Sequence, residues 1–199
     1  NHKYYPLGSY DAEGLIAGAD WFSGTQHDLR AEASASLQIT NAITMSAWLK
    51  YDTVVSGAFY GVLQIGTTYI RREDSNRFRC IFTGLSASSI FSTTVPVSNT
   101  WYHVGATYDG TAIRVYVNGV QEASTPSSGL MTPNTDFTHI GRWVNKYHNG
   151  ILDEVRVSSV ARSAGWIRTS YDNQSDPAAF LALGAEKPRP LEGLLLMLR

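Results

Sequence analysis

The sequence predicts an all-β protein, a sandwich of two antiparallel sheets, and residues 101–123 give the clearest indication of it. Asp-Gly at 109–110 and Asn-Gly at 118–119 stand one strand length apart, and each is expected to form a two-residue turn with positive φ. The strand between them alternates, with its apolar face made by Ile113, Val115 and Val117. A three-stranded meander with one apolar face needs a second sheet to cover it.

The other face of that central strand carries Arg114 and Tyr116 and is expected to be the wetter one. A second run, residues 43–50, alternates just as strictly, which predicts a core strand. Its core face is made by Ile43, Met45, Ala47 and Leu49.

Size and charge limit the classes of protein that this chain can belong to. With 199 residues, it is expected to form one domain whose core needs no disulfide or metal. The net charge is −1 and the basic residues form no stripe, so nucleic acid is not expected as a partner. No apolar run approaches the roughly 18 residues of a membrane span. The chain begins with Asn1, which indicates a processed terminus or a fragment.

The remaining elements follow from alternation and turn residues. Residues 1–18 are expected to be an extended N-terminal segment with at most one edge strand, residues 19–186 the folded domain, and residues 187–199 a C-terminal tail. The tail is interpreted as a docking strand, the start of an anchor or appended sequence. Further strands are expected at 58–66, 68–72, 77–83, 89–95, 137–143, 151–157 and 179–183.

A helix is expected only at residues 163–171. Ser163 can cap its N-terminus, and Trp166 or Ile167 would share the buried side with Tyr171. Residues 172–177 are expected to end it.

Several short motifs together resemble one known family. They are Phe22-Ser-Gly24, Ser34-Ala-Ser-Leu37, Trp101-Tyr-His-Val104, Tyr108-Asp-Gly110, Val115-Tyr-Val-Asn-Gly119, Gly150-Ile-Leu-Asp-Glu-Val-Arg-Val157 and Ala161-Arg-Ser163. In order and spacing, residues 19–186 resemble a laminin G-like domain of the concanavalin A-like lectin/glucanase jelly-roll superfamily. The resemblance implies a jelly roll with Greek-key connections that serves as a binding or adhesion module of a larger secreted or cell-surface protein. It also implies that some members hold calcium.

One loop departs from the family pattern. Where relatives carry acidic residues after the Phe-x-Gly turn, this chain has Gln26 and His27, followed by Asp28. The resemblance therefore does not carry a metal site over to this loop.

Catalytic motifs are missing from the sequence. Jelly-roll glucanases place paired carboxylates as Glu-x-Asp-x-x-Glu on one strand, and that pattern does not occur here. The sequence also has no Gly-x-Ser-x-Gly, no His-Glu-x-x-His and no paired cysteines. The chain is therefore expected not to be an enzyme.

Asp153 is the most informative charged residue. Strand alternation would place it on the core side with Ile151, Val155 and Val157. An inward carboxylate has to be hydrogen-bonded, paired or bound to a cation. Two interpretations follow: a buried aspartate that accepts backbone N–H and hydroxyl bonds, or a ligand of structural Ca²⁺ assisted by Asp20.

A candidate ligand site lies in the loop after the 137–143 strand, where aromatic rings alternate with amide and cationic donors. Aromatic faces can cover the apolar side of a sugar ring while the donors bind its hydroxyls. The proposed contacts are Arg142, Trp143, Asn145, Tyr147 and His148, with Arg71 from a neighbouring strand. Alternatively, Trp143 packs under the sheet, the loop is merely solvated, and Arg71, Arg72 and Arg79 form a solvated sheet face. His103 is interpreted as structural.

These observations favour a non-catalytic extracellular recognition module, with a glycan as its partner and a secreted or cell-surface location. The alternative is a structural protein–protein or adhesion module of a surface, filament or virion assembly, in which copies of the chain associate with each other.

Overall fold

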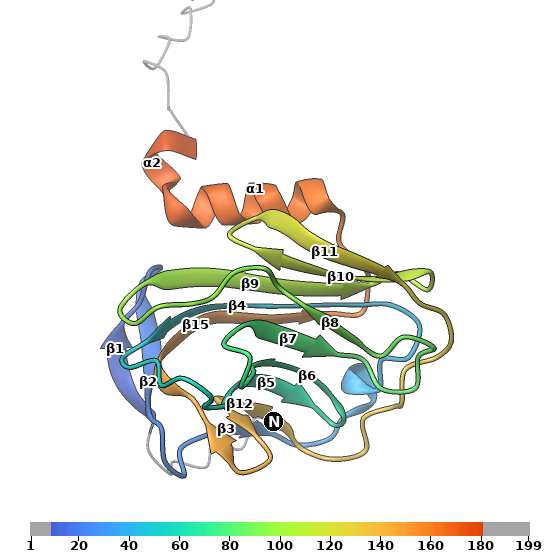
Figure 1. Ribbon diagram of the computed structural model, residues 1–199, viewed down its shortest axis with the longest axis horizontal. Coiled ribbons are helices and arrows are strands. Elements are labelled where there is room, and N and C mark those ends of the chain that lie inside the picture. The colour runs from blue at the N-terminus through green and yellow to red at the C-terminus, as the bar shows by residue number, and fades with distance from the viewer. Residues whose placement is uncertain (1–8, 181–199) are drawn as a thin grey trace, which may run out of the picture.

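Two antiparallel sheets stack face to face in the computed structural model of the chain, which describes residues 9–180 (Figure 1). In spatial order, the seven-stranded sheet contains β1 (Ser9–Glu13), β2 (Gly18–Ser23), β15 (Asn149–Ser158), β4 (Ile43–Tyr51), β9 (Trp101–Tyr108), β10 (Ala112–Val117) and β11 (Val120–Pro126). The six-stranded sheet contains β3 (Leu29–Ala31), β12 (Thr138–Ile140), β5 (Tyr60–Ile65), β6 (Thr68–Arg72), β7 (Phe78–Ile81) and β8 (Ser89–Phe91). This arrangement confirms the predicted jelly-roll sandwich.

The remaining elements are short. A small hairpin pairs β13 (Arg142–Trp143) with β14 (Lys146–Tyr147), and η1 (Ala35–Leu37) is a single 3₁₀ turn. Two helices end the described chain, α1 (Ala164–Ser175) and α2 (Pro177–Phe180). No helix within residues 9–180 is long and apolar enough to cross a membrane.

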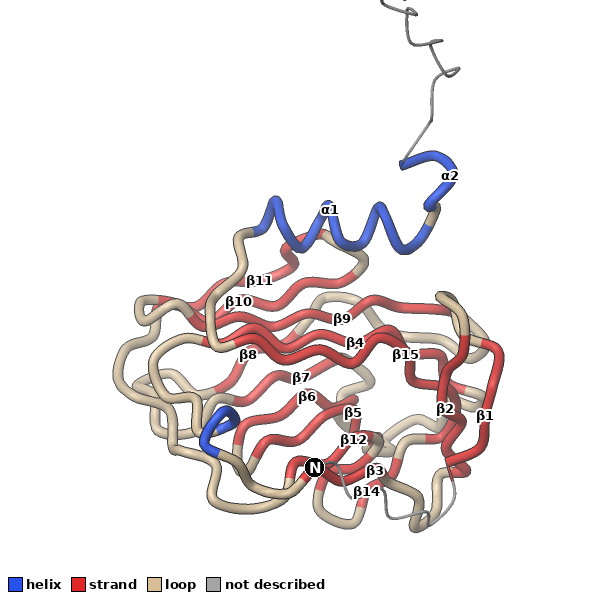
Figure 2. The backbone as a smooth tube through the Cα atoms, turned by 180° about the vertical axis from the view of Figure 1, so that it is seen from behind, coloured by secondary structure: helices blue, strands red, loops and turns tan. Residues whose placement is uncertain are grey.

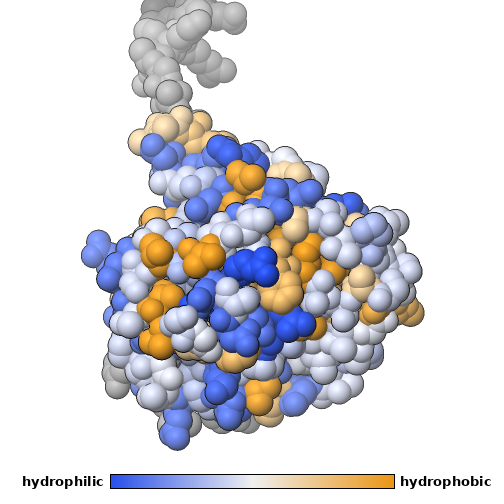
Figure 3. Space-filling model, in the orientation of Figure 1, coloured by the Kyte–Doolittle hydropathy of each residue, from blue (hydrophilic) through white to orange (hydrophobic). Residues whose placement is uncertain are grey.

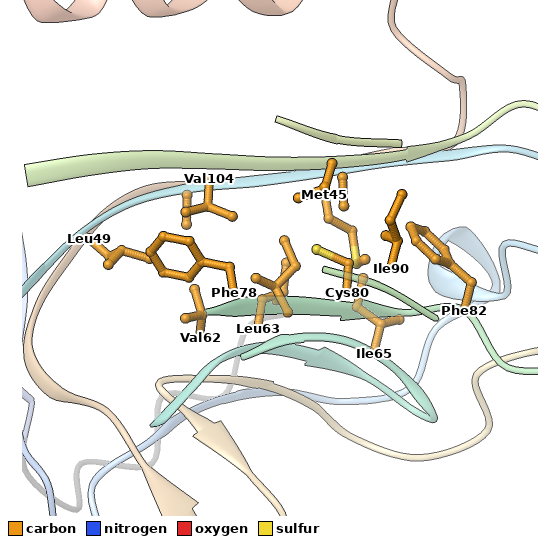
Figure 4. Close-up of a cluster of buried hydrophobic side chains, with 14 of the residues drawn as sticks. Met45, Leu49, Val62, Leu63, Ile65, Phe78, Cys80, Phe82, Ile90 and Val104 are labelled. Carbon is orange, nitrogen blue, oxygen red and sulfur yellow. The ribbon is translucent and has the colours of Figure 1, made fainter. Parts of the chain in front are cut away.

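The core lies between the two sheets. Met45, Leu49 and Val104 project from the larger sheet toward Phe78 and Cys80 of the smaller one (Figure 4). All five side chains are fully buried. The alternation predicted for residues 43–50 is therefore confirmed.

Helix α1 covers the other face of the seven-stranded sheet, lying along β10 and β11 in both backbone views (Figures 1 and 2). Trp48 Nε1 donates to Gln174 Oε1 at 2.7 Å, and the Trp48 and Tyr171 rings stack at 5.4 Å. Tyr116, on the same face, is only 2% exposed. The prediction that this face of β10 is the wetter one is therefore wrong in part. Periodicity within one strand cannot show that a distant helix covers its polar side.

A β-bulge in β15 reverses the predicted facing of Asp153. The pairing of β15 with β4 shifts between Asp153 and Arg156, and Glu154 has a positive φ of 50°. Leu152 lies in the core, so Asp153, opposite Trp48, faces the other side. The extra residue then returns Val155 and Val157 to the core side. The prediction that Asp153 shares their side is corrected.

Smaller corrections concern turns and ends. Only Asn118-Gly119 has two positive φ values; at the other turn Gly110 alone does, and the Asp109 carboxylate accepts from the N–H groups of Thr111 and Ala112. The predicted strand 137–143 breaks at Gly141, where a Cβ would lie 2.4 Å from the Phe22 ring.

The predicted ends of the domain also change. Strand β1 lies within the segment 1–18 and pairs with β2, so the sheet begins before residue 19. Residues 179–180 belong to α2 and not to a final strand, while the predicted tail, 187–199, lies outside the described residues. Helix α1 begins after Ser163, which caps it as predicted, and buries Ile167.

Two histidines are buried in the sandwich. His148 is 0% exposed and lies between the rings of Tyr51 and Phe22, at 4.9 and 5.9 Å. His103 is 3% exposed and lies 5.2 Å from Trp48. Burial lowers the pKa of His148 to about 3. Burial, aided by the positive charge of Arg156, lowers the pKa of His103 to about 4.

These two histidines predict a loss of stability in mild acid. As the pH falls below the ordinary value of 6.5, the unfolded chain takes up protons that the folded chain excludes, until each folded pKa is reached. Each histidine should therefore cost about 1.4 kcal/mol of unfolding free energy per pH unit in this window. Urea unfolding gives the free energy of unfolding at each pH. Between pH 6 and pH 4, this free energy should fall less steeply in His148→Leu than in the parent, by the equivalent of about one proton taken up on unfolding. Equal slopes in the variant and the parent would contradict the assignment, and the two profiles should run parallel above pH 7.

Candidate ligand-binding face

The β13–β14 hairpin lies against the outward face of the six-stranded sheet. A Cβ added at Gly61 of β5 would lie 2.2 Å from the backbone carbon of Arg142, so only glycine permits this close approach. Gln64 accepts from the Val144 N–H at 3.1 Å and secures the tip of the hairpin. The sheet therefore sets the position of Trp143.

Trp143 stacks on an arginine within an aromatic group. The Arg71 guanidinium carbon lies 3.4 Å from the centre of the Trp143 ring, with the rings of Phe59 and Tyr69 at 4.9 and 5.3 Å. The Trp143 ring itself lies 5.9 Å from Phe59 and 5.4 Å from Tyr69. Trp143 is half-buried, so part of its surface faces solvent.

A carboxylate beneath this group holds the arginine in place. Arg71 donates from Nε and Nη2 to the two oxygens of Glu73, at 2.7 and 2.8 Å, and Arg79 Nη1 approaches the same carboxylate at 3.4 Å. Glu73 and Arg71 are 6% and 4% exposed. Bidentate pairing in a buried site fixes the guanidinium plane. Arg71 therefore supports Trp143 from beneath, and its role as a direct ligand contact stays a prediction.

A second buried carboxylate anchors the other end of the hairpin. Asp28, 3% exposed, accepts from Arg30 Nε at 2.9 Å, contacts His139 Nδ1 at 2.6 Å and has Arg142 Nη1 at 3.7 Å. Burial alone would raise the pKa of Asp28, but the hydrogen bonds from His139 and Arg30 outweigh it and hold the pKa below its usual value. The resulting negative charge restrains Arg142, whose guanidinium also lies 5.6 Å from the Tyr147 ring.

Most of the residues predicted from the sequence lie on the β13–β14 hairpin, where Tyr147 pairs with Arg142 and Trp143 with Lys146. Arg142, Trp143, Asn145 and Tyr147 all belong to the hairpin, and Arg71 lies beneath it. His148 does not join them, because it points into the core, and its prediction as a ligand contact is wrong. The alternative interpretation, in which Trp143 packs against the sheet, also holds in part, because the ring stacks on Arg71 and is half-buried.

Sequence reasoning did not predict the aromatic neighbours of Trp143. Tyr69 and Arg71 alternate along β6, and Phe91 faces Arg79 across the β7–β8 pair, with the Arg79 guanidinium 5.0 Å from its ring. Alternation along each strand could have shown which of these residues face the same side of the sheet. That inference requires the register between neighbouring strands, which the sequence does not provide. Arg72 has the opposite parity and is buried at 0% exposure, so it does not belong to this face.

This face can bind but has no free acid–base pair among the described residues that form it. Its two buried carboxylates, Asp28 and Glu73, are both engaged by arginines. Partly exposed rings and outward donors remain available to a ligand. That set suits a polar ligand with one apolar side.

The residues proposed for calcium fit a hydrogen-bonded role better than a metal site. One oxygen of Asp153, Oδ2, accepts from the N–H groups of Leu15 and Ile16, both at 3.0 Å. Asp20 lies on β2 beside Leu152, and both aspartates line a recess of about 220 Å³. Within residues 9–180, no three His, Cys, Asp or Glu side chains gather closely enough to hold a metal ion. Asp153 thus accepts backbone N–H bonds, as the first interpretation expects, and calcium stays a prediction.

The fold and this face define a jelly-roll module of the lectin type. A laminin G family model, described as the concanavalin A-like lectin/glucanases superfamily, matches residues 23–168, and the chain belongs to this family. Human pappalysin-1 is 25% identical in an alignment 168 residues long, which covers 72% of this chain but only 10% of that protein. The chain thus spans about a tenth of that relative.

Two solved structures show the same fold. A candidate carbohydrate-binding protein from Bacteroides ovatus aligns with a TM-score of 0.62 and 23% identity, covering 73% of this chain and 45% of that one. Domain 4 of an extracellular arabinanase from Geobacillus stearothermophilus, solved in complex with arabinotriose, aligns with a TM-score of 0.58 and 20% identity. That alignment covers 81% of this chain and 80% of that one.

Asp153→Asn tests the two interpretations of this aspartate. The amide keeps one acceptor but loses the charge, so the variant should be less stable by about 1.5–3 kcal/mol. Melting temperatures should not respond to millimolar calcium or to a chelator in either protein. A calcium-dependent gain in the parent that disappears in Asp153→Asn would instead establish the metal site. Asp20→Asn, measured in parallel, would show whether the second carboxylate takes part.

Proposed function

We propose that this chain is a non-catalytic carbohydrate-recognition module that binds sugar on the β13–β14 hairpin. The observation that carries the proposal is the stack of Trp143 on Arg71, which Glu73 holds from beneath. The packed ring offers its free surface without having to be ordered on binding. Such preorganisation lowers the entropic cost of association.

The chemistry of the hairpin matches a sugar. A pyranose or furanose ring has an apolar side, which can stack on an aromatic ring. Its hydroxyls in turn need hydrogen-bond donors and acceptors. Asn145 is exposed between the two strands of the hairpin, Tyr147 is half-buried, and the Arg142 guanidinium lies 5.6 Å from the centre of the Tyr147 ring. On the face seen in Figure 1, hydrophobic side chains lie in small groups among hydrophilic ones (Figure 3). A broad apolar patch would favour a protein partner.

The comparisons support the same class of function. The arabinanase domain carries arabinotriose in its structure, and the Bacteroides ovatus protein is described as a candidate carbohydrate-binding protein. A place outside the cell is part of the proposal and is supported by the description of that arabinanase as extracellular.

A protein-binding or self-associating module is the second candidate. Strand β11 is an edge of the seven-stranded sheet and exposes Val120 at 53%. An open edge with an exposed β-branched residue can pair with a strand of another chain. Concentration-independent monomers in sedimentation would count against this candidate.

Alanine substitutions in the hairpin test the sugar site. Trp143→Ala and Tyr147→Ala should each weaken binding at least about tenfold, because each removes a ring that covers the sugar. Binding is measured by calorimetry with arabinotriose and with the strongest hit from a glycan array, run in calcium and in chelator. Phe180→Ala, which removes an exposed ring of α2, serves as the matched control and should bind normally.

Stability measurements separate the loss of a contact from the loss of the fold. Trp143→Phe keeps a ring on Arg71 and should retain part of the affinity with a near-normal melting temperature. If the parent protein binds no glycan on the array, either in calcium or in chelator, the sugar proposal is refuted and the protein-binding alternative is favoured.

A further inference from the structure

A second recess lies outside the hairpin site, between the outer face of the seven-stranded sheet and the start of α1. Its volume is about 410 Å³, within the range of roughly 300–1,000 Å³ that is usual for small-molecule sites. Its polar and aromatic lining is made by Thr44, Ser46, Arg156, Ser158, Arg162 and Trp166.

The sheet supplies the floor of this recess. Arg156 pairs with Ser46, and Ser158 with Thr44, so these four side chains share the outer face of β4 and β15. Ser46 is 4% exposed and lines the recess, so its hydroxyl is part of a polar floor.

The helix supplies a ring and a charge. Trp166 is 39% exposed and is the one exposed tryptophan of the described chain. The Arg162 guanidinium carbon lies 5.0 Å from the centre of its ring. No carboxylate pairs with Arg162 among the described residues, whereas Arg156 is paired with Glu154. The guanidinium therefore has no acidic partner among the described residues, and part of the Trp166 ring faces solvent.

The backbone holds Arg162 at the rim. Its N–H donates to Thr44 Oγ1 at 2.8 Å, and the same hydroxyl donates to the Val160 carbonyl at 2.8 Å. Ile167 of α1 is 0% exposed and packs against the sheet beside Gly105 of β9. The segment that carries Arg162 and Trp166 is therefore fixed at both ends.

We propose that this recess is a second ligand site, which binds an acidic sugar unit, a sugar ring that carries a carboxylate. The Trp166 face covers the apolar side of the ring, and the Arg162 guanidinium receives the carboxylate through two parallel hydrogen bonds. The Ser46 and Ser158 hydroxyls bind ring hydroxyls from the floor. The ligand differs in charge from a neutral sugar, and the site does not depend on the hairpin.

The test uses sodium glucuronate as the probe, with glucose as its neutral counterpart and sodium sulfate as an oxyanion without a ring. Titrations are followed by NMR of the tryptophan indole N–H signals in the full chain, with the Trp166 signal assigned by its absence in Trp166→Ala. Glucuronate should shift the Trp166 signal and bind at least about tenfold more tightly than glucose.

Matched variants locate the contact. Arg162→Ala and Trp166→Ala should each weaken glucuronate binding about tenfold or more, and Ser46→Ala by a few-fold. Arg168→Ala removes a guanidinium of the same helix that pairs with Asp172 away from the recess, and it should bind normally. Trp143→Ala should also bind glucuronate normally, which separates this site from the hairpin. Arg162→Gln provides the same test if the alanine variant folds poorly.

Three results would overturn the proposal. They are equal binding of glucose and glucuronate, an unchanged glucuronate affinity in Arg162→Ala, and sulfate binding as tight as glucuronate binding. The last result would make the recess a site for a free oxyanion, without a role for the ring.

Discussion

The burial of β4 on both of its faces is the constraint on which the rest of the structure depends. One face packs into the core through Met45 and Leu49, and the other lies under α1, where Trp48 bonds to Gln174. A strand enclosed in this way can contact a ligand only where α1 leaves its outer face open, at Thr44 and Ser46. The seven-stranded sheet thus contributes mainly to the stability of the fold. Its outer face is accessible to a ligand where α1 begins.

The six-stranded sheet has a different role because the β13–β14 hairpin, and no helix, lies on its outward face. Gly61 admits the hairpin, and Trp143 then rests on Arg71. A rigid sheet beneath a short hairpin places aromatic and polar side chains without a long loop that would have to be ordered on binding. The same reasoning explains why Arg71 is buried, since its function there is to support a ring.

Two buried carboxylates in this protein, Glu73 and Asp28, are paired with arginines, and this pairing organises the surface above them. Glu73 orients Arg71, and Asp28 gathers Arg30, His139 and Arg142. Removing one partner would leave an uncompensated buried charge, which is far costlier than losing an exposed pair. By contrast, Arg162 stands at a rim beside Trp166 with no acidic partner in the described chain, where a ligand can complete its bonding.

The sequence by itself determined the class of fold, because alternation and turn dipeptides are local and repeat along each strand. It also determined the core face of β4 and the start of α1 at Ser163. Only the tertiary structure decided that His148 turns inward, that one extra residue at Glu154 reverses Asp153, and that Arg71 lies beneath Trp143. These outcomes depend on bulges, on register and on which distant element covers a face. Each of them follows from packing between segments far apart in the chain, which no local pattern records.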